Sequence, residues 1–149
     1  MPILDKIGKK FFRQKSGIPQ GSVLSTILCN FFYGDLERNK LPFVSASTGV
    51  LLRLIDDFLF ITLNRGHAEQ FLRVMHAGHP EYGAFVSAEK SLANFKVSVD
   101  GRKINQLVGT QEFPYCGNLI HTKTLGIRRD RVRKITSSTS FYPLIVLHT

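Results

Sequence analysis

The sequence of 149 residues predicts one α+β domain in which helices pack against an antiparallel sheet. Apolar residues recur at three- and four-residue steps over residues 22–39, which is the spacing of an amphipathic helix. Two apolar runs, 50–55 and 58–63, flank a pair of aspartates and together predict a hairpin. After residue 80, short apolar segments alternate with turn residues, a pattern that is typical of strands.

The boundaries of these elements follow from local chemistry. Glycines at both ends of loop 17–21 permit backbone angles that other residues disfavour, and Ser22 is a suitable N-cap for the helix that follows. Gly78 ends a second helix, and Asp100-Gly101 is a hairpin turn. In chain order we expect a strand at 10–14, a turn at 17–21, a helix at 22–39, a loop at 41–49, a hairpin at 50–63, a helix at 66–77, strands near 84–87, 92–97 and 104–108, and a hairpin at 113–120.

Asp56 and Asp57 lie at the expected tip of the first hairpin. Two adjacent carboxylates in an apolar stretch are costly unless a cation faces them. At a turn the alternation of side chains relaxes, so both acids can approach one solvent-facing edge. Mg²⁺ prefers one or two carboxylates together with substrate phosphates. An isolated Asp-Asp pair is more often an ordinary acidic turn, but the apolar run 50–55 before it favours a metal site.

Loop 17–21 is a second candidate site, made of Gly17, Ile18, Pro19, Gln20 and Gly21. It joins a rigid turn to the start of a helix, where free backbone N–H groups and the helix dipole favour a phosphate or nucleotide. The Gln20 amide can hydrogen-bond a base or sugar edge. Taken alone, the same residues would be read as an ordinary strand-to-helix turn with a serine cap.

Composition excludes several other classes of protein. No apolar run approaches the length of a membrane span, and the start has no signal-peptide pattern. Cys29 and Cys116 are far apart without metal-ligand spacing, so we expect reduced thiols. The net charge of +9 is concentrated at the ends, with +4 over residues 1–16 and +5 over 121–149. Basic ends suit a polyanion, although solvated termini would look the same.

Loop 17–21 and the Asp56-Asp57 hairpin stand about 30 residues apart, and in this order they resemble motifs B and C of reverse transcriptases. Leu54 stands where many retroelement enzymes have an aromatic residue, and Leu-x-Asp-Asp-Phe resembles the telomerase reverse transcriptases of animals. The further segments that agree with this family are Leu24–Cys29 and Tyr33–Glu37 in the helix, Pro80–Gly83 with Lys90 and Asn94-Phe95 in motif D, and Phe113–Gly117 in motif E, the primer grip. The resemblance covers about residues 7–125.

The resemblance implies a partial reverse-transcriptase palm and RNA-templated synthesis of telomeric DNA by a two-metal mechanism. Asp56 and Asp57 would be catalytic Mg²⁺ ligands, and Lys90 would neutralise or protonate pyrophosphate. Residues 17–21 would contact the incoming nucleotide and template base. Tyr115, Cys116 and Gly117 would hold the primer end. The partners implied are telomerase RNA, a telomeric DNA primer and deoxynucleoside triphosphates, in a nuclear ribonucleoprotein with no membrane.

Three departures from the family matter. Tyr115 stands where telomerases have tryptophan. The family places a third metal-binding aspartate on a motif A strand before motif B, and Asp5 has no strand of matching character around it, so we expect this chain alone to be inactive. The resemblance fades after residue 125. We therefore divide the chain into a partial palm, 1–125, and a divergent basic and apolar tail, 126–149, which need not fold.

Other interpretations remain open at this point. The chain could be the palm of a retroelement or intron reverse transcriptase. It could be a non-catalytic module whose basic ends bind nucleic acid or a partner. It could also be a truncated product without a role, because a palm cut before its motif A strand should expose an unpaired sheet edge.

Overall fold

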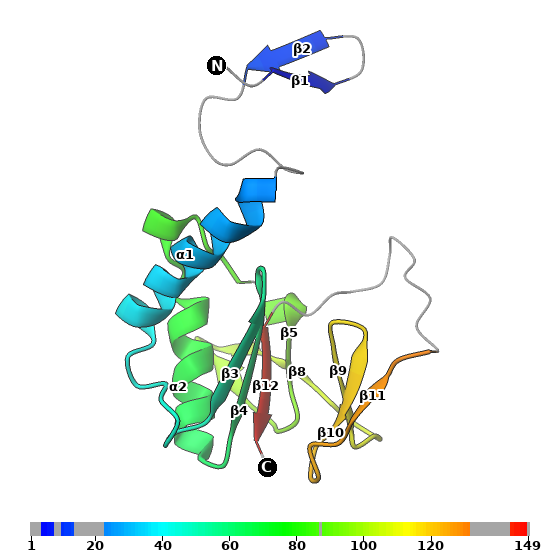
Figure 1. The fold of residues 1–149 in the computed structure, drawn as a ribbon. Coiled ribbons are helices and arrows are strands. Elements are labelled where there is room, and N and C mark those ends of the chain that lie inside the picture. The colour runs from blue at the N-terminus through cyan, green and yellow to red at the C-terminus, as the bar shows by residue number, and fades with distance from the viewer. Residues whose placement is uncertain (1–3, 8–9, 14–22, 87, 132–143, 149) are drawn as a thin grey trace.

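In a computed structural model, the described residues are 4–7, 10–13, 23–86, 88–131 and 144–148 (Figure 1). Their helices are α1 (Val23–Lys40) and α2 (Arg65–His76), with short 3-10 helices η1 (Pro80–Tyr82) and η2 (Ala88–Lys90). Their strands are β1 (Leu4–Ile7), β2 (Lys10–Arg13), β3 (Val50–Leu54), β4 (Asp57–Thr62), β5 (Ser91–Ala93), β6 (Ser98–Val99), β7 (Arg102–Lys103), β8 (Asn105–Gln106), β9 (Glu112–Tyr115), β10 (Asn118–His121), β11 (Ile127–Arg129) and β12 (Leu144–His148).

The predicted α+β class is confirmed, together with both helices and the hairpins at 50–63 and 113–120. The strand expected near 84–87 is wrong. Gly83 adopts a left-handed conformation (φ 58°) after η1 and turns the chain back, so that Ala84 forms only an isolated bridge with His79. The expected strand at 92–97 is reduced to β5, and the one at 104–108 to β8.

The largest sheet has five strands in the order β3-β4-β12-β5-β8. We expected an antiparallel sheet, but only β3 and β4 pair in that way within it, because they alone are joined by a tight turn. β12 is parallel to both β4 and β5, and β5 is parallel to β8. Both edges of β4 are therefore paired, and among the described strands β3 and β8 form the edges of this sheet.

Strand β4 is covered on both faces, as the layers in Figure 1 show. Phe58 and Phe60 belong to the core cluster that includes Leu36 of α1 and Phe71 of α2. Leu59 between them packs with Phe113 and Ile120 of the β9-β10-β11 sheet on the opposite face. Alternation along the strand thus places the helices on one side of β4 and the small antiparallel sheet on the other.

The two helices differ in how much apolar surface they bury. The buried residues of α2 (Ala68, Phe71, Leu72 and Met75) form a single face. On α1, Leu36 is fully buried, but Phe31 is 74% exposed, and Leu24, Ile27, Leu28 and Phe32 are exposed as well. Within the part of the chain that the structure describes, neither helix is sufficiently long and apolar to cross a membrane.

Candidate active site

The aspartate pair lies at the tip of the β3–β4 hairpin, as predicted. Leu54 pairs with Asp57, so Ile55 and Asp56 form a two-residue turn. Asp56 is exposed, whereas Asp57 is the first residue of β4 and is partly buried. Asp57 and Leu59 share one face of the strand, so the Asp57 side chain points toward the β9–β10 hairpin and away from the helices.

The turn carries backbone strain at Ile55, which has a φ of +59°. This left-handed conformation is a genuine outlier for a β-branched residue. Tight two-residue turns normally place glycine or asparagine where φ is positive. The backbone that presents the two aspartates is therefore not the one that its own turn residues prefer, and other contacts must hold it.

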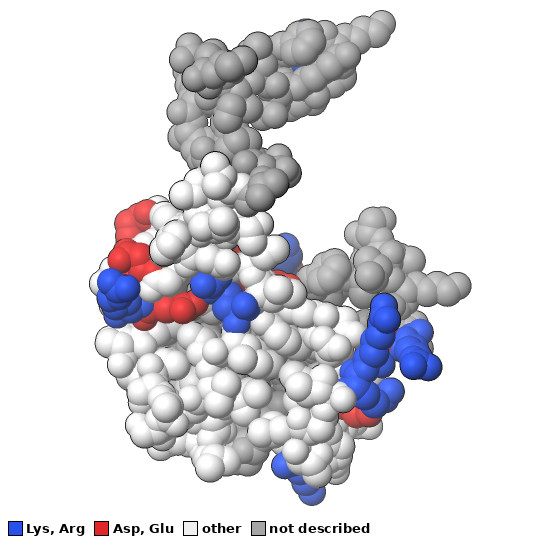
Figure 2. Space-filling model, in the orientation of Figure 1, with Lys and Arg blue, Asp and Glu red and all other residues white. Residues whose placement is uncertain are grey.

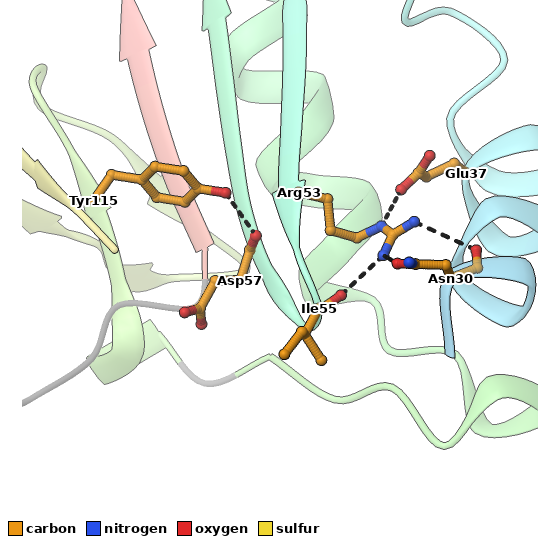
Figure 3. A network of polar contacts seen from close by, with 6 residues as sticks. All are labelled: Asn30, Glu37, Arg53, Ile55, Asp57 and Tyr115. Carbon is orange, nitrogen blue, oxygen red and sulfur yellow. Dashed lines mark hydrogen bonds and ion pairs between the residues drawn. The ribbon is translucent and has the colours of Figure 1, made fainter. Parts of the chain in front are cut away.

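Arg53 supplies such a contact from within β3 (Figure 3). Its Nη1 donates to the Ile55 carbonyl at 3.0 Å and to Oδ1 of Asn30 at 2.9 Å. Its Nε donates to Oε1 of Glu37 at 2.5 Å, so the arginine ties the hairpin tip to α1. The Arg53 side chain is only 13% exposed, and its guanidinium lies 5.4 Å from the centroid of the Tyr33 ring.

The β9–β10 hairpin contacts the aspartate pair from the other side (Figure 3). The Tyr115 hydroxyl donates to the Asp57 carbonyl at 3.0 Å, and Cys116 Sγ lies 3.6 Å from Asp57 Oδ2 as a thiol donor. Cys116 and Gly117 form a two-residue turn in which both φ angles are positive. The structure therefore brings together two predicted groups, Asp56-Asp57 and Tyr115–Gly117, that lie far apart in sequence.

The electrostatics of the tip reflect two nearby carboxylates. Partial burial, followed by the charge of Asp56, raises the pKa of Asp57 above its ordinary value. Burial and the charge of Asp57 raise the pKa of the Cys116 thiol to about 11, so this cysteine stays protonated at neutral pH. Burial likewise raises the pKa of Tyr115, which keeps its hydroxyl available as a donor.

The two aspartates fit a divalent cation. A hard cation takes carboxylate oxygens, and it would offset the repulsion that raises the pKa of Asp57. Asp56 remains accessible to solvent. Among the described residues there is no group of three or more histidine, cysteine, aspartate or glutamate side chains able to hold a metal ion.

Exposed arginines lie beside the β9–β10 turn. Arg129 of β11 pairs with Asn118, the residue that follows Gly117. Arg128 forms an ion pair with Glu112, whereas the Arg129 side chain makes no hydrogen bond or ion pair with another described residue. Figure 2 shows lysine and arginine side chains over this small sheet, whereas acidic and basic side chains lie together around α1. The β9–β10 turn thus has an exposed arginine next to it.

The remaining predicted residues are not joined to the tip. Residues 17–21, including Gln20, lie outside the described residues. Lys90 ends η2 and is exposed, and within the described ranges no hydrogen bond or ion pair links it to Asp56 or Asp57. Cys29 and Cys116 are free thiols, as expected.

Arg53 was not among the sequence candidates, although a signal for it existed. An arginine inside the apolar run 50–55 is as costly as the aspartates after it unless a partner is present. Its helix partners, Asn30 and Glu37, are separated by seven residues, or two turns of α1, and so share a face. The sequence does not reveal that this face meets β3.

Comparisons with known proteins agree on one kind of relative. No protein-family model matches the chain. It is 45% identical over 128 residues to the telomerase reverse transcriptase of Bos taurus, and 43% identical over 126 residues to that of Oryzias latipes. With the telomerase reverse transcriptase of Oryza sativa the identity is 35% over 144 residues. These three matches span 83% to 86% of this chain, which corresponds to only 11% to 12% of the length of the relatives.

Proposed function

Because this chain is homologous to one segment of the telomerase reverse transcriptases, we propose that it forms the motif B to motif E part of a palm that synthesises telomeric DNA on an RNA template. The observation that carries the proposal is the junction of the two hairpins. The tip with Asp56 and Asp57 lies against the tip with Tyr115 and Cys116, as metal ligands and a primer grip require.

The chain's residues would divide the work as follows. Asp56 and Asp57 would hold Mg²⁺, which when bound supplies the positive charge that activates the primer 3′-hydroxyl and stabilises the departing pyrophosphate. Tyr115, Cys116 and Gly117 would orient the primer end beside the aspartates. Arg129, which is exposed next to this turn, would contact a backbone phosphate of the primer.

Two further roles are proposed from the resemblance. Loop 17–21, with Gln20, would contact the incoming nucleotide and the template base. Lys90 would neutralise or protonate pyrophosphate, and its exposure leaves it accessible for that role. Asn105 Nδ2 donates to the Glu89 carbonyl at 2.7 Å and so fixes η2, the element that carries Lys90. The complete protein would act in the nucleus as a ribonucleoprotein with telomerase RNA.

A segment graft tests the catalytic assignment. The matching segment of the Bos taurus telomerase reverse transcriptase is replaced by this chain, and primer extension is measured with the bovine RNA. We expect the graft to extend primer, and Asp56→Ala to reduce extension by at least about a hundredfold, since it removes an electrostatic group needed in the transition state. Asp35→Ala is the matched control, because this exposed aspartate bonds Tyr82 and Asn39 on α1 instead. Near-normal extension by Asp56→Ala would refute the assignment.

The chain by itself should be inactive. Its described residues supply two carboxylates at the tip and no third metal-binding group beside them. We therefore expect no templated nucleotide addition by the purified 149-residue chain, assayed with primer, template and Mg²⁺. Synthesis that depends on Mg²⁺ and is lost in Asp56→Ala would contradict this expectation.

A second candidate function is nucleic-acid binding without catalysis, which the exposed arginines of β11 favour. Phosphate contacts release counterions, so such binding weakens steeply with salt. Titration of a single-stranded DNA at several salt concentrations would detect it. Under this alternative, Arg129→Gln lowers the affinity for DNA and makes that affinity depend less steeply on salt concentration, while Asp56→Ala changes neither.

A further inference from the structure

The carbonyls of Ile55 and Asp57, the residues before and after Asp56, are each held by a side chain from a different part of the fold. The Ile55 carbonyl accepts from Arg53, which is bound to α1, and the Asp57 carbonyl accepts from Tyr115 of β9. We propose that Arg53 and Tyr115 are positioning residues that together set the orientation of Asp56 and Asp57 for metal binding. The proposal rests on the function proposed above.

Arg53 and Tyr115 together form a clamp on the β3–β4 turn, and strain in the turn explains why this clamp is needed. Ile55 occupies a left-handed conformation without glycine's freedom, so an unsupported turn would relax to other backbone angles. Relaxation would rotate the peptide groups on both sides of Asp56 and redirect its carboxylate relative to that of Asp57. A metal site requires its ligands to be held close to their binding geometry before the ion arrives.

The Arg53 half of the clamp is rigid. The planar guanidinium contacts Glu37, Asn30 and the Ile55 carbonyl at the same time. It also lies over two rings, 5.4 Å from the centroid of Tyr33 and 5.9 Å from that of Phe58. A lysine could keep the charge opposite Glu37 but could not reproduce this fork of bonds.

The Tyr115 half depends on one hydroxyl group. Phe113 on the same strand is fully buried, which fixes β9 against β4 and brings the phenol to the Asp57 carbonyl. Tyr115→Phe would keep the ring and remove only this donor. Any effect of that change on Asp56 and Asp57 would therefore come from the lost hydroxyl, through its hydrogen bond to Asp57 and its contact with Cys116.

The experiment uses the full 149-residue chain labelled with ¹⁵N, and Mn²⁺ as the probe, because this hard divalent ion accepts the same oxygen ligands as Mg²⁺. Paramagnetic broadening of the Asp56 and Asp57 amide signals gives the Mn²⁺ affinity. Amide hydrogen exchange over residues 54–58 without metal reports the order of the turn. The variants are Tyr115→Phe and Arg53→Lys.

Matched controls lose the same chemical groups elsewhere in the fold. Tyr82→Phe removes a hydroxyl that donates to Asp35 at 2.7 Å on α1. Arg65→Lys alters a guanidinium that pairs with Glu69 and lies over the Phe95 ring. Neither control contacts the hairpin tip, so both report what an equivalent loss does to the fold as a whole.

We expect Tyr115→Phe and Arg53→Lys each to weaken Mn²⁺ binding about three- to tenfold, the loss of one or two hydrogen bonds, and to speed exchange at 54–58. The controls should change Mn²⁺ affinity less than about twofold. Unchanged affinity and exchange in both clamp variants would overturn the proposal. If the unmodified chain binds no Mn²⁺, the proposed metal role fails, and exchange over 54–58 still decides the clamp separately.

Discussion

The two hairpins that meet at the candidate site have turns of the same length but solve the same geometric problem differently. The β9–β10 turn is Cys116-Gly117, with cysteine at a φ of +45° and glycine at a φ of +76°. The β3–β4 turn is Ile55-Asp56, with isoleucine at a φ of +59° and no glycine. Positive φ costs glycine little and costs a β-branched residue about 1–2 kcal/mol.

This difference shows where the shape of each tip originates. The β9–β10 turn is encoded partly by its own residues, since Gly117 supplies one of its two left-handed positions at little cost, whereas Cys116 supplies the other with a Cβ. The β3–β4 turn is imposed by tertiary contacts, above all by Arg53, which links the Ile55 carbonyl to α1. The tip that presents the aspartates has no glycine, so its conformation depends more on the rest of the fold than that of the β9–β10 turn does.

Of the substitutions that test this comparison, removal of the Arg53 side chain should have the largest effect on stability. Arg53→Ala leaves Glu37, whose side chain is 28% exposed, without its partner and removes the support of the Ile55 carbonyl. We expect the free energy of unfolding to fall by about 2–3 kcal/mol, below the cost of breaking a fully buried pair. Urea unfolding followed by circular dichroism measures the change. A loss no larger than that of Arg65→Ala would mean that the turn does not depend on α1.

Replacing one residue in each turn should have an intermediate effect on stability and should show how far the two turns differ. A Cβ at Gly117 meets no atom within 4 Å, so Gly117→Ala costs only its backbone strain, about 1 kcal/mol. Ile55→Gly should change stability by less than about 0.5 kcal/mol, because relief of strain offsets the greater entropy of the unfolded chain and the lost packing. Thermal unfolding of both variants measures this. Equal losses in the two would show that the turns do not differ in origin.

The smallest effect is expected from the charge of Asp57. Its pKa is raised by partial burial and by Asp56, so the folded chain binds this proton more tightly than the unfolded chain does. Stability contributed by the protonated carboxyl is present below the ordinary pKa of aspartate and is lost as pH rises through the raised value. Asp57→Asn should remove this dependence of stability on pH. It should raise the melting temperature at neutral pH but not near pH ~3. A lower melting temperature at pH 7 would contradict the assigned burial and repulsion.

Local patterns predicted the parts of the fold that local chemistry determines. The second helix, which ends before Gly78, and the hairpin over 50–63 were both predicted from the sequence, and each is present. The segment after residue 80 was read as strands because its apolar residues resemble them, but Gly83 and two 3-10 turns divide it into shorter pieces. The parallel pairing of β12 is non-local and had no signal in the sequence.

The candidate site divides in the same way. Asp56 and Asp57 were recognisable because two charges interrupt an apolar run. Tyr115 and Cys116 were predicted only from a family resemblance. Their contact with Asp57 depends on the tertiary structure and could not be predicted from local sequence patterns. Arg53 was overlooked because its partners lie on another element, and periodicity alone does not show which helix face meets which strand.

The place of β12 in the sheet has a consequence for the order in which the fold assembles. β3 and β4 are joined by a two-residue turn and can pair early, since closing a short loop costs little entropy. β12 must instead find its place between β4 and β5, both of which lie far earlier in the chain. Pairings of high sequence separation form slowly, so the aspartate hairpin should exist before the sheet around it is complete.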